Sequence, residues 1–120
     1  MKHLKQIILN WLSGIRLAWR GNTVFRGMVA FSILGIVIGL VARIGTLKVT
    51  LLLAIAFIGF GMEIANSSIE TLCNIVHPGK SEKVKEVKDA FSAVPIFTYT
   101  AYVVSWLLLV APSLWKMIVR

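Results

Sequence analysis

The chain has 120 residues, 58% of them hydrophobic, and a formal net charge of +8. A soluble domain of this length is usually nearer half apolar, and the chain is too short for a soluble core plus a separate membrane anchor. The apolar residues fall in long uncharged runs, which are typical of helices that cross a bilayer. Basic residues flank these runs, which favours anchoring at an anionic membrane surface. They form no stripe interleaved with exposed aromatic residues, so a nucleic-acid partner is not expected.

The N-terminal segment, residues 4–20, is predicted to form an amphipathic helix. Apolar residues recur at steps of three and four from Leu4 to Trp19, and polar or basic residues occupy the other side. Such a helix can lie in the membrane interface with its tryptophans at headgroup depth. The pair Gly21–Asn22 is expected to break this helix before the first membrane span.

Three membrane-spanning helices are predicted after this break, so the chain is interpreted as an all-α membrane protein with a single membrane domain, 1–120. Gly35 and Gly39 form a GxxxG pattern, which permits close helix packing. Pro95 and Pro112 predict kinks or frayed ends in the last span. The predicted bounds are 27–42 for the first span, 49–76 for the second, 77–89 for a cytoplasmic loop and 90–115 for the third.

The distribution of basic residues predicts that the N-terminus lies in the cytoplasm. With this orientation nine Lys and Arg lie on the cytoplasmic side and four on the other. The cytoplasmic set is Lys2, Lys5, Arg16, Arg20, Arg26, Lys80, Lys83, Lys85 and Lys88, and the other set is Arg43, Lys48, Lys116 and Arg120.

Two acidic residues, Glu63 and Glu70, are on the second apolar helix. A charged side chain deep in a membrane helix costs about 2.5–3.5 kcal/mol on insertion scales, so a chain that carries two is expected to use them. Asn66 and Ser67 lie between them, and the four residues stand at i, i+3, i+4 and i+7, on one helix face. Glu70 is expected near the cytoplasmic boundary, with Glu63 about two turns deeper.

This placement predicts phosphoryl transfer onto a lipid. The deeper carboxylate would meet a headgroup hydroxyl, and the outer one would meet water-soluble phosphates and a divalent metal. Transfer from ATP needs a group that orients the nucleophile and cations around the phosphates, and the lysines of residues 80–88 can supply positive charge. The alternative is that both glutamates pair with bases of neighbouring helices and only hold an oligomer together.

The segment E-I-A-N-S-S-I-E, Glu63 to Glu70, followed by Lys88-Asp89-Ala90 before the third span, resembles the signature of the prokaryotic diacylglycerol kinase family, which includes the undecaprenol kinases of Gram-positive bacteria. The resemblance extends upstream to Gly14-Ile15-Arg16, Ala18-Trp19 and Phe25-Arg26 and covers about residues 12–110.

This resemblance implies a homotrimer with sites between subunits in the bacterial cytoplasmic membrane. The implied reaction transfers the γ-phosphate of ATP, with Mg²⁺, to a lipid alcohol such as diacylglycerol or undecaprenol. It also implies roles for individual residues. Glu63 would be the general base or orienting carboxylate. Glu70 would bind the metal with the nucleotide, and Asn66, on the same face, would belong to the cofactor-binding residues with Lys88 and Asp89, which would contact the nucleotide. Arg16, Trp19 and Arg26 would lie near the lipid.

The sequence also departs from the family pattern at positions that bear on metal and nucleotide contacts. Asn22 stands where the family usually has a glutamate that helps to hold the metal, and as a neutral residue it could only be a weak ligand. Met28 and Asn74 replace an acidic or polar residue and an aspartate, and Gly79-Lys80-Ser81 replaces a Glu-x-His contact.

These departures keep a second hypothesis open, a catalytically impaired scaffold or regulator with the same fold. A third hypothesis, a small proton-coupled exporter, follows from the membrane-embedded glutamates, but it fits the charged Lys88-Asp89 segment less well.

Overall fold

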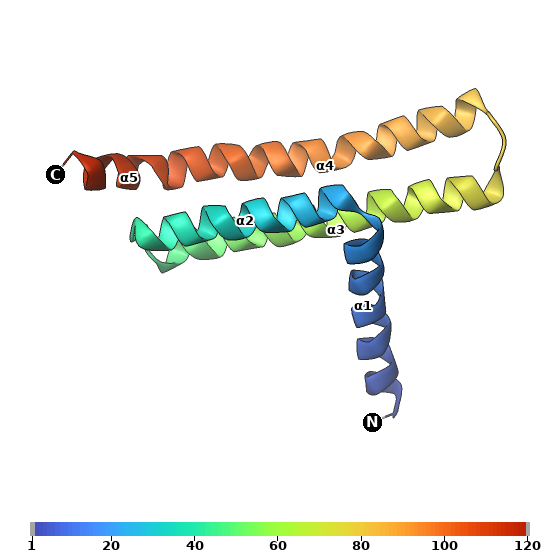
Figure 1. Cartoon of the computed structure of the whole chain (residues 1–120), viewed down its shortest axis with the longest axis horizontal. Coiled ribbons are helices and arrows are strands. Elements are labelled where there is room, and N and C mark those ends of the chain that lie inside the picture. The colour runs from blue at the N-terminus through green and yellow to red at the C-terminus, as the bar shows by residue number, and fades with distance from the viewer. Residues whose placement is uncertain (1, 120) are drawn as a thin grey trace.

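The structure, a computed structural model, describes residues 2–119. Met1 and Arg120 lie outside the described residues, and with Arg120 so does one of the basic residues predicted on the non-cytoplasmic side. The helices α2, α3 and α4 run side by side, α5 continues the line of α4, and α1 stands crosswise to this bundle (Figure 1). Their bounds are α1 Lys2–Gly21, α2 Thr23–Val41, α3 Thr46–Val76, α4 Glu82–Leu109 and α5 Ala111–Ile118.

Three helical segments of the described chain are long and apolar enough to cross a membrane, which confirms the all-α class and the number of predicted spans. They are Thr23–Val41 with 19 residues, Thr46–Val76 with 31 and Glu82–Ile118 with 37. A helix of 31 residues is about 46 Å long, which exceeds the roughly 30 Å of a bilayer core. The polar end of α3 therefore has the length to extend beyond the membrane core.

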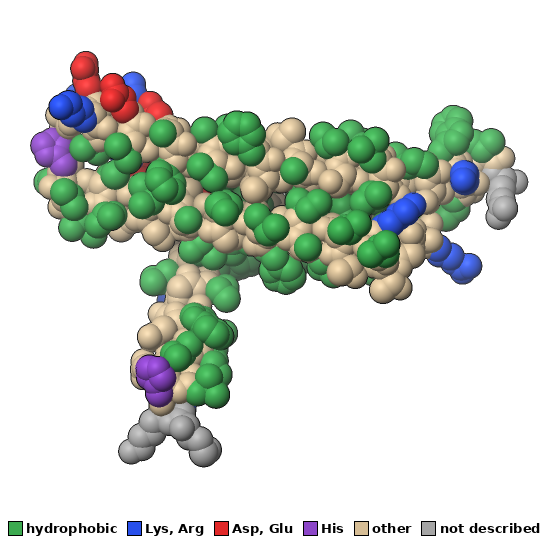
Figure 2. Space-filling model, turned by 180° about the vertical axis from the view of Figure 1, so that it is seen from behind, with side chains coloured by type: hydrophobic (Ala, Val, Ile, Leu, Met, Phe, Trp, Pro, Cys, Tyr) green, Lys and Arg blue, Asp and Glu red, His purple; other side chains and the backbone are tan. Residues whose placement is uncertain are grey.

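Charged side chains gather at the two ends of the bundle, while the surface between them is hydrophobic or uncharged on the face that Figure 2 shows. Acidic side chains cluster at the end where α3 and α4 are joined (Figure 2). This distribution matches the exposure of large apolar side chains along the middle of α2, α3 and α4. A surface of this kind is suited to lipid or to other copies of a membrane protein.

The connection between α3 and α4 is shorter than the predicted loop of residues 77–89, because α4 begins at Glu82. Ser81 caps this helix by accepting a hydrogen bond from the Val84 N–H at 3.4 Å, and Glu82 in the first turn suits the positive end of the helix. Lys88 and Asp89 therefore lie on a helix rather than in a loop.

The two prolines of the last span act differently. The helix α4 continues through Pro95 without interruption, although proline cannot donate a backbone hydrogen bond. It ends before Pro112, where Val110 separates α4 from α5 and Pro112 occupies the first turn of α5.

The glycines Gly35 and Gly39 make room for side chains rather than for another backbone. Tyr102 Oη donates to the Ser32 carbonyl of α2 at 2.9 Å, and Trp106 Nε1 donates to the Gly35 carbonyl at 2.9 Å. A methyl group on Gly35 would lie 2.8 Å from the Tyr102 hydroxyl and 3.0 Å from the Trp106 ring. The helices α2 and α4 are thus linked by two aromatic donors that need a glycine opposite them.

Gly35→Ala should therefore lower the thermal unfolding midpoint in detergent. The added methyl overpacks a tight contact and displaces two donors, and such changes typically cost about 1–3 kcal/mol. Gly27→Ala on the same helix is the control, because no other group lies within 4 Å of the position that its methyl group would take. Equal midpoints for the two variants would contradict the proposed role of Gly35.

Candidate active site

The chain turns at Asn22, as the Gly21–Asn22 pair predicts. Asn22 has extended backbone angles (φ −121°, ψ 107°), and its Oδ1 accepts a hydrogen bond from the Phe25 N–H at 2.9 Å, which caps α2. Phe25 is buried and packs edge-on against Trp19 of α1 and Phe60 of α3, with ring centroids 6.4 Å and 5.9 Å apart. These contacts hold the α1–α2 junction against α3.

Glu63 is buried, with 4% of its surface exposed, and its carboxylate faces this junction. Asn22 Nδ2 donates to Glu63 Oε1 at 2.6 Å and to Ser67 Oγ at 2.5 Å. A buried carboxylate is costly unless it is hydrogen-bonded, and a bond to a charged group typically contributes about 1.5–3 kcal/mol. The Asn22 amide thus offsets part of the cost of placing Glu63 inside the bundle.

A hollow of about 600 Å³, called here the inner hollow, opens beside Glu63. No buried side-chain nitrogen or oxygen within residues 2–119 lacks a hydrogen-bond partner. The second oxygen of Glu63, Oε2, has no hydrogen bond among the described residues and is therefore not fully enclosed, and Glu63 lines this hollow. The inner hollow is lined by Val24, Gly27, Met28, Glu63, Asn66, Ser92, Pro95, Ile96, Tyr99 and Thr100.

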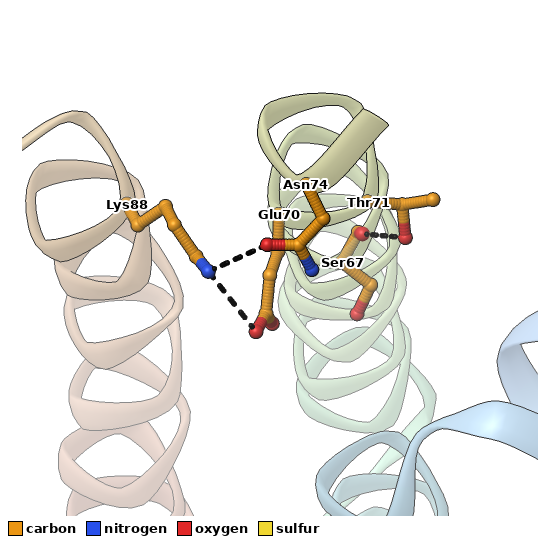
Figure 3. Close-up of polar contacts among 5 residues, drawn as sticks. All are labelled: Ser67, Glu70, Thr71, Asn74 and Lys88. Atoms are coloured by element: carbon orange, nitrogen blue, oxygen red, sulfur yellow. Dashed lines mark hydrogen bonds and ion pairs between the residues drawn. The ribbon is translucent and has the colours of Figure 1, made fainter. Parts of the chain in front are cut away.

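Glu70 lies two turns farther along α3 and is exposed. Lys88 of α4 reaches across to it, with Nζ 3.9 Å from Glu70 Oε1, and donates to Asn74 Oδ1 at 3.0 Å (Figure 3). The side chains of Lys88 and Glu70 are 31% and 59% exposed, so water and solutes can reach both groups. The polar ends of α3 and α4 therefore carry an accessible carboxylate beside an accessible ammonium group.

A second hollow of about 510 Å³, called here the outer hollow, lies at the α3–α4 connection next to this pair. Lys80, Lys85 and Lys88 contribute positive charge to it, and Glu82 and Asp89 contribute negative charge. The remaining lining residues are Asn74, His77, Pro78, Gly79, Ser81 and Val84.

The fit of a divalent metal can be judged from the carboxylates present. No three His, Cys, Asp or Glu side chains come together within the described residues in a way that could hold a metal ion. Mg²⁺, however, is commonly bound by only one or two carboxylates together with substrate phosphates. The exposed Glu70 carboxylate fits this second arrangement, in which the metal arrives with a nucleotide.

The predicted site residues divide into two groups in the structure. Glu63 and Asn66 meet at the inner hollow, and Lys88 and Asp89 meet at the outer one, with Glu70 bonded to Lys88. The residues predicted near the lipid lie outside both hollows: Arg16 and Trp19 are exposed on α1, and exposed Arg26 donates to Thr23 Oγ1 at 3.1 Å.

Sequence reasoning missed the α4 side of the inner hollow. Ser92, Tyr99 and Thr100 line it, and they stand at i, i+7 and i+8, which places them on one helix face. Polar residues recurring at helical spacing within an apolar span were the signal that could have identified them.

A family model described as prokaryotic diacylglycerol kinase matches residues 10–110, which include all the residues of both hollows. The chain belongs to the prokaryotic diacylglycerol kinase family. No curated protein matches the chain.

Membership of this kinase family confirms the resemblance seen in the motif of α3. It supports a lipid kinase in the broad sense, and with the three membrane-length helices it supports a membrane protein.

A substitution at Lys88 can test whether the Lys88–Glu70 pair stabilises the fold or serves to bind a ligand. Because both side chains are partly exposed, Lys88→Gln should change the free energy of unfolding by less than about 1 kcal/mol. The free energy of unfolding is measured by thermal or denaturant unfolding in detergent. Lys85→Gln, one turn earlier on α4, is the control. A loss of about 3 kcal/mol or more, as expected for a pair that holds helices together, would favour the structural alternative.

Proposed function

We propose that this family member is an ATP-dependent lipid kinase that transfers the γ-phosphate to a membrane lipid alcohol at the cytoplasmic interface. One observation carries the proposal. The same face of α3 presents a buried carboxylate to the inner hollow and, two turns away, an exposed carboxylate beside a lysine and the outer hollow. Seven residues of helix separate the two groups by about 10 Å, a span that a lipid hydroxyl and a triphosphate can share.

At the inner hollow, Glu63 Oε2 is the group that takes the proton of the lipid hydroxyl. The hydroxyl oxygen then forms a bond to the γ-phosphorus, the bond from that phosphorus to the β–γ bridging oxygen breaks, and ADP leaves. A positioned general base of this kind typically contributes about 10²–10⁴-fold to the rate. Asn66 lies one turn along the same hollow and supports the acceptor beside Glu63.

At the outer hollow, the lysines and Glu70 receive the nucleotide. Lys88, which pairs with Glu70 and donates to Asn74, would contact phosphate oxygens, and Asp89 lies next to it on α4. Glu70 would hold Mg²⁺ together with the phosphates. When bound, Mg²⁺ neutralises the charge that develops on the phosphate oxygens.

The acceptor is proposed to be a lipid because the inner hollow lies among membrane-length apolar helices. Diacylglycerol and undecaprenol are the candidates that the family suggests. We further propose a bacterial cytoplasmic membrane location with the N-terminus inside, α1 lying in the interface with Arg16, Trp19 and Arg26 near the lipid, and a homotrimer. The unequal distribution of basic residues and the exposed apolar surface of the bundle support these placements.

Glu63→Gln should lower phosphate transfer at least about a hundredfold while the protein remains folded, since the amide cannot accept the hydroxyl proton. Transfer is measured with radiolabelled ATP in detergent or bilayers. Glu86→Gln is the matched control, because Glu86 is an exposed acid of α4 that lines neither hollow. Unchanged turnover in Glu63→Gln would remove Glu63 from the mechanism.

The same assay against a panel of lipid alcohols identifies the acceptor. Diacylglycerol and undecaprenol are expected to be phosphorylated in preference to a water-soluble alcohol such as glycerol. A well-folded wild-type protein that phosphorylates no member of the panel would support the scaffold or regulator hypothesis instead.

A further inference from the structure

The orientation of the Asn22 amide is determined by its neighbours. Its Oδ1 accepts from the Phe25 backbone N–H, which can only donate, so Nδ2 must face Glu63 and Ser67. Exchanging the two amide atoms would place a carbonyl oxygen against a carboxylate. The donor direction of the amide is therefore set by the backbone of α2 itself.

All the polar atoms of the Asn22 side chain are used. The two hydrogens of Nδ2 serve Glu63 Oε1 at 2.6 Å and Ser67 Oγ at 2.5 Å, and Oδ1 serves the helix cap at 2.9 Å. To coordinate a metal, Oδ1 would have to release the Phe25 N–H and turn away from the start of α2. Asn22 bonds Glu63 and Ser67, whereas the exposed Glu70 lies two turns beyond Glu63 on α3 and pairs with Lys88 of α4.

We propose that Asn22 is a positioning residue for Glu63 and not a metal ligand. This inference rests on the proposed function, in which Glu63 accepts the hydroxyl proton. By binding Oε1, the amide directs Oε2 into the inner hollow and keeps the carboxylate from rotating toward other partners. The residue at this position thus supplies a hydrogen-bond donor to the reacting carboxylate, and the metal depends on Glu70 and the nucleotide phosphates.

The hydrogen bond is tested without turnover, by NMR of detergent-solubilised protein labelled with ¹⁵N-asparagine. The chain has Asn10, Asn22, Asn66 and Asn74, so few side-chain amide signals are present. The Asn22 signal, identified by its loss in Asn22→Ser, should shift in Glu63→Met, which has a similar length but no oxygen acceptor. The control variant is Ser68→Ala, because the Ser68 hydroxyl donates to the Ile64 carbonyl and not to Asn22. This change should leave the Asn22 signal in place.

The positioning role is tested by the kinetics of Asn22→Ser. Serine is as good a helix cap as asparagine, so α2 still begins normally, but its side chain is too short to reach Glu63. The turnover number should fall about ten- to a hundredfold, as misplacement of a reacting group does, while KM for ATP stays within about twofold. Asn10→Ser, the same change on exposed α1, should leave both constants unchanged.

The metal is followed by electron paramagnetic resonance of Mn²⁺ bound with the non-hydrolysable nucleotide AMP-PNP. Asn22→Ser should keep the wild-type Mn²⁺ affinity within about twofold, and a tenfold loss would make Asn22 a metal ligand and overturn the inference. An Asn22 signal that does not shift in Glu63→Met, or a turnover number unchanged in Asn22→Ser, would overturn it as well. Absence of transfer by the wild-type protein, with the NMR shift present, would instead refute the proposed function and leave the hydrogen bond established.

Discussion

The burial of a carboxylate inside a bundle of apolar helices determines how the neighbouring segments of this structure must be arranged. Glu63 is almost fully buried, and a charge in that position is tolerated only with hydrogen-bonding partners close by. For Glu63 this partner is the side-chain amide of Asn22, a residue outside α3. The chain must therefore turn between α1 and α2 at the level of Glu63. The aromatic contacts of Phe25 with Trp19 and Phe60 then hold this turn in place.

Asn22 and Asn74, two positions where the resemblance implies an acidic residue, share a physical character. Each bonds an ionisable group of the site: Asn22 bonds Glu63, and Asn74 bonds Lys88. An amide can donate to a carboxylate and accept from an ammonium group without adding charge. Asn22 and Asn74 thus give Glu63 and Lys88 hydrogen-bonding partners without adding charge to the site.

Local periodicity was enough to predict part of this site from the sequence. The spacing of Glu63, Asn66, Ser67 and Glu70 predicts one face of a helix, and all four lie on the continuous helix α3, where Glu63 and Ser67 both contact Asn22. The predicted loop of residues 77–89 is too long, because its bounds follow the run of charged residues and not the helix cap formed by Ser81 and the flanking Glu82. A helix can begin among charged residues when its first turn is capped, so Lys88 and Asp89 were assigned to a loop although they lie on α4.

Contacts between residues far apart in the chain could not be predicted in this way. The bonds from Tyr102 to Ser32 and from Trp106 to Gly35 join residues 70 and 71 positions apart, and nothing in the local pattern pairs them. The GxxxG pattern indicates a tight contact but not its partner, and aromatic side chains of α4 lie opposite Gly35.

The aromatic link between α2 and α4 also bears on what can enter the inner hollow. Phe31 packs against Tyr99, which lines the hollow, and against Tyr102, with ring centroids 5.6 Å and 6.2 Å apart, and the Tyr102 hydroxyl bonds α2, so aromatic side chains bridge the two helices next to the hollow. A long acyl or prenyl chain that reached the hollow would therefore have to bend out sideways into the surrounding bilayer. Its length would then matter little for recognition, and discrimination among acceptors would fall to the few atoms around the hydroxyl.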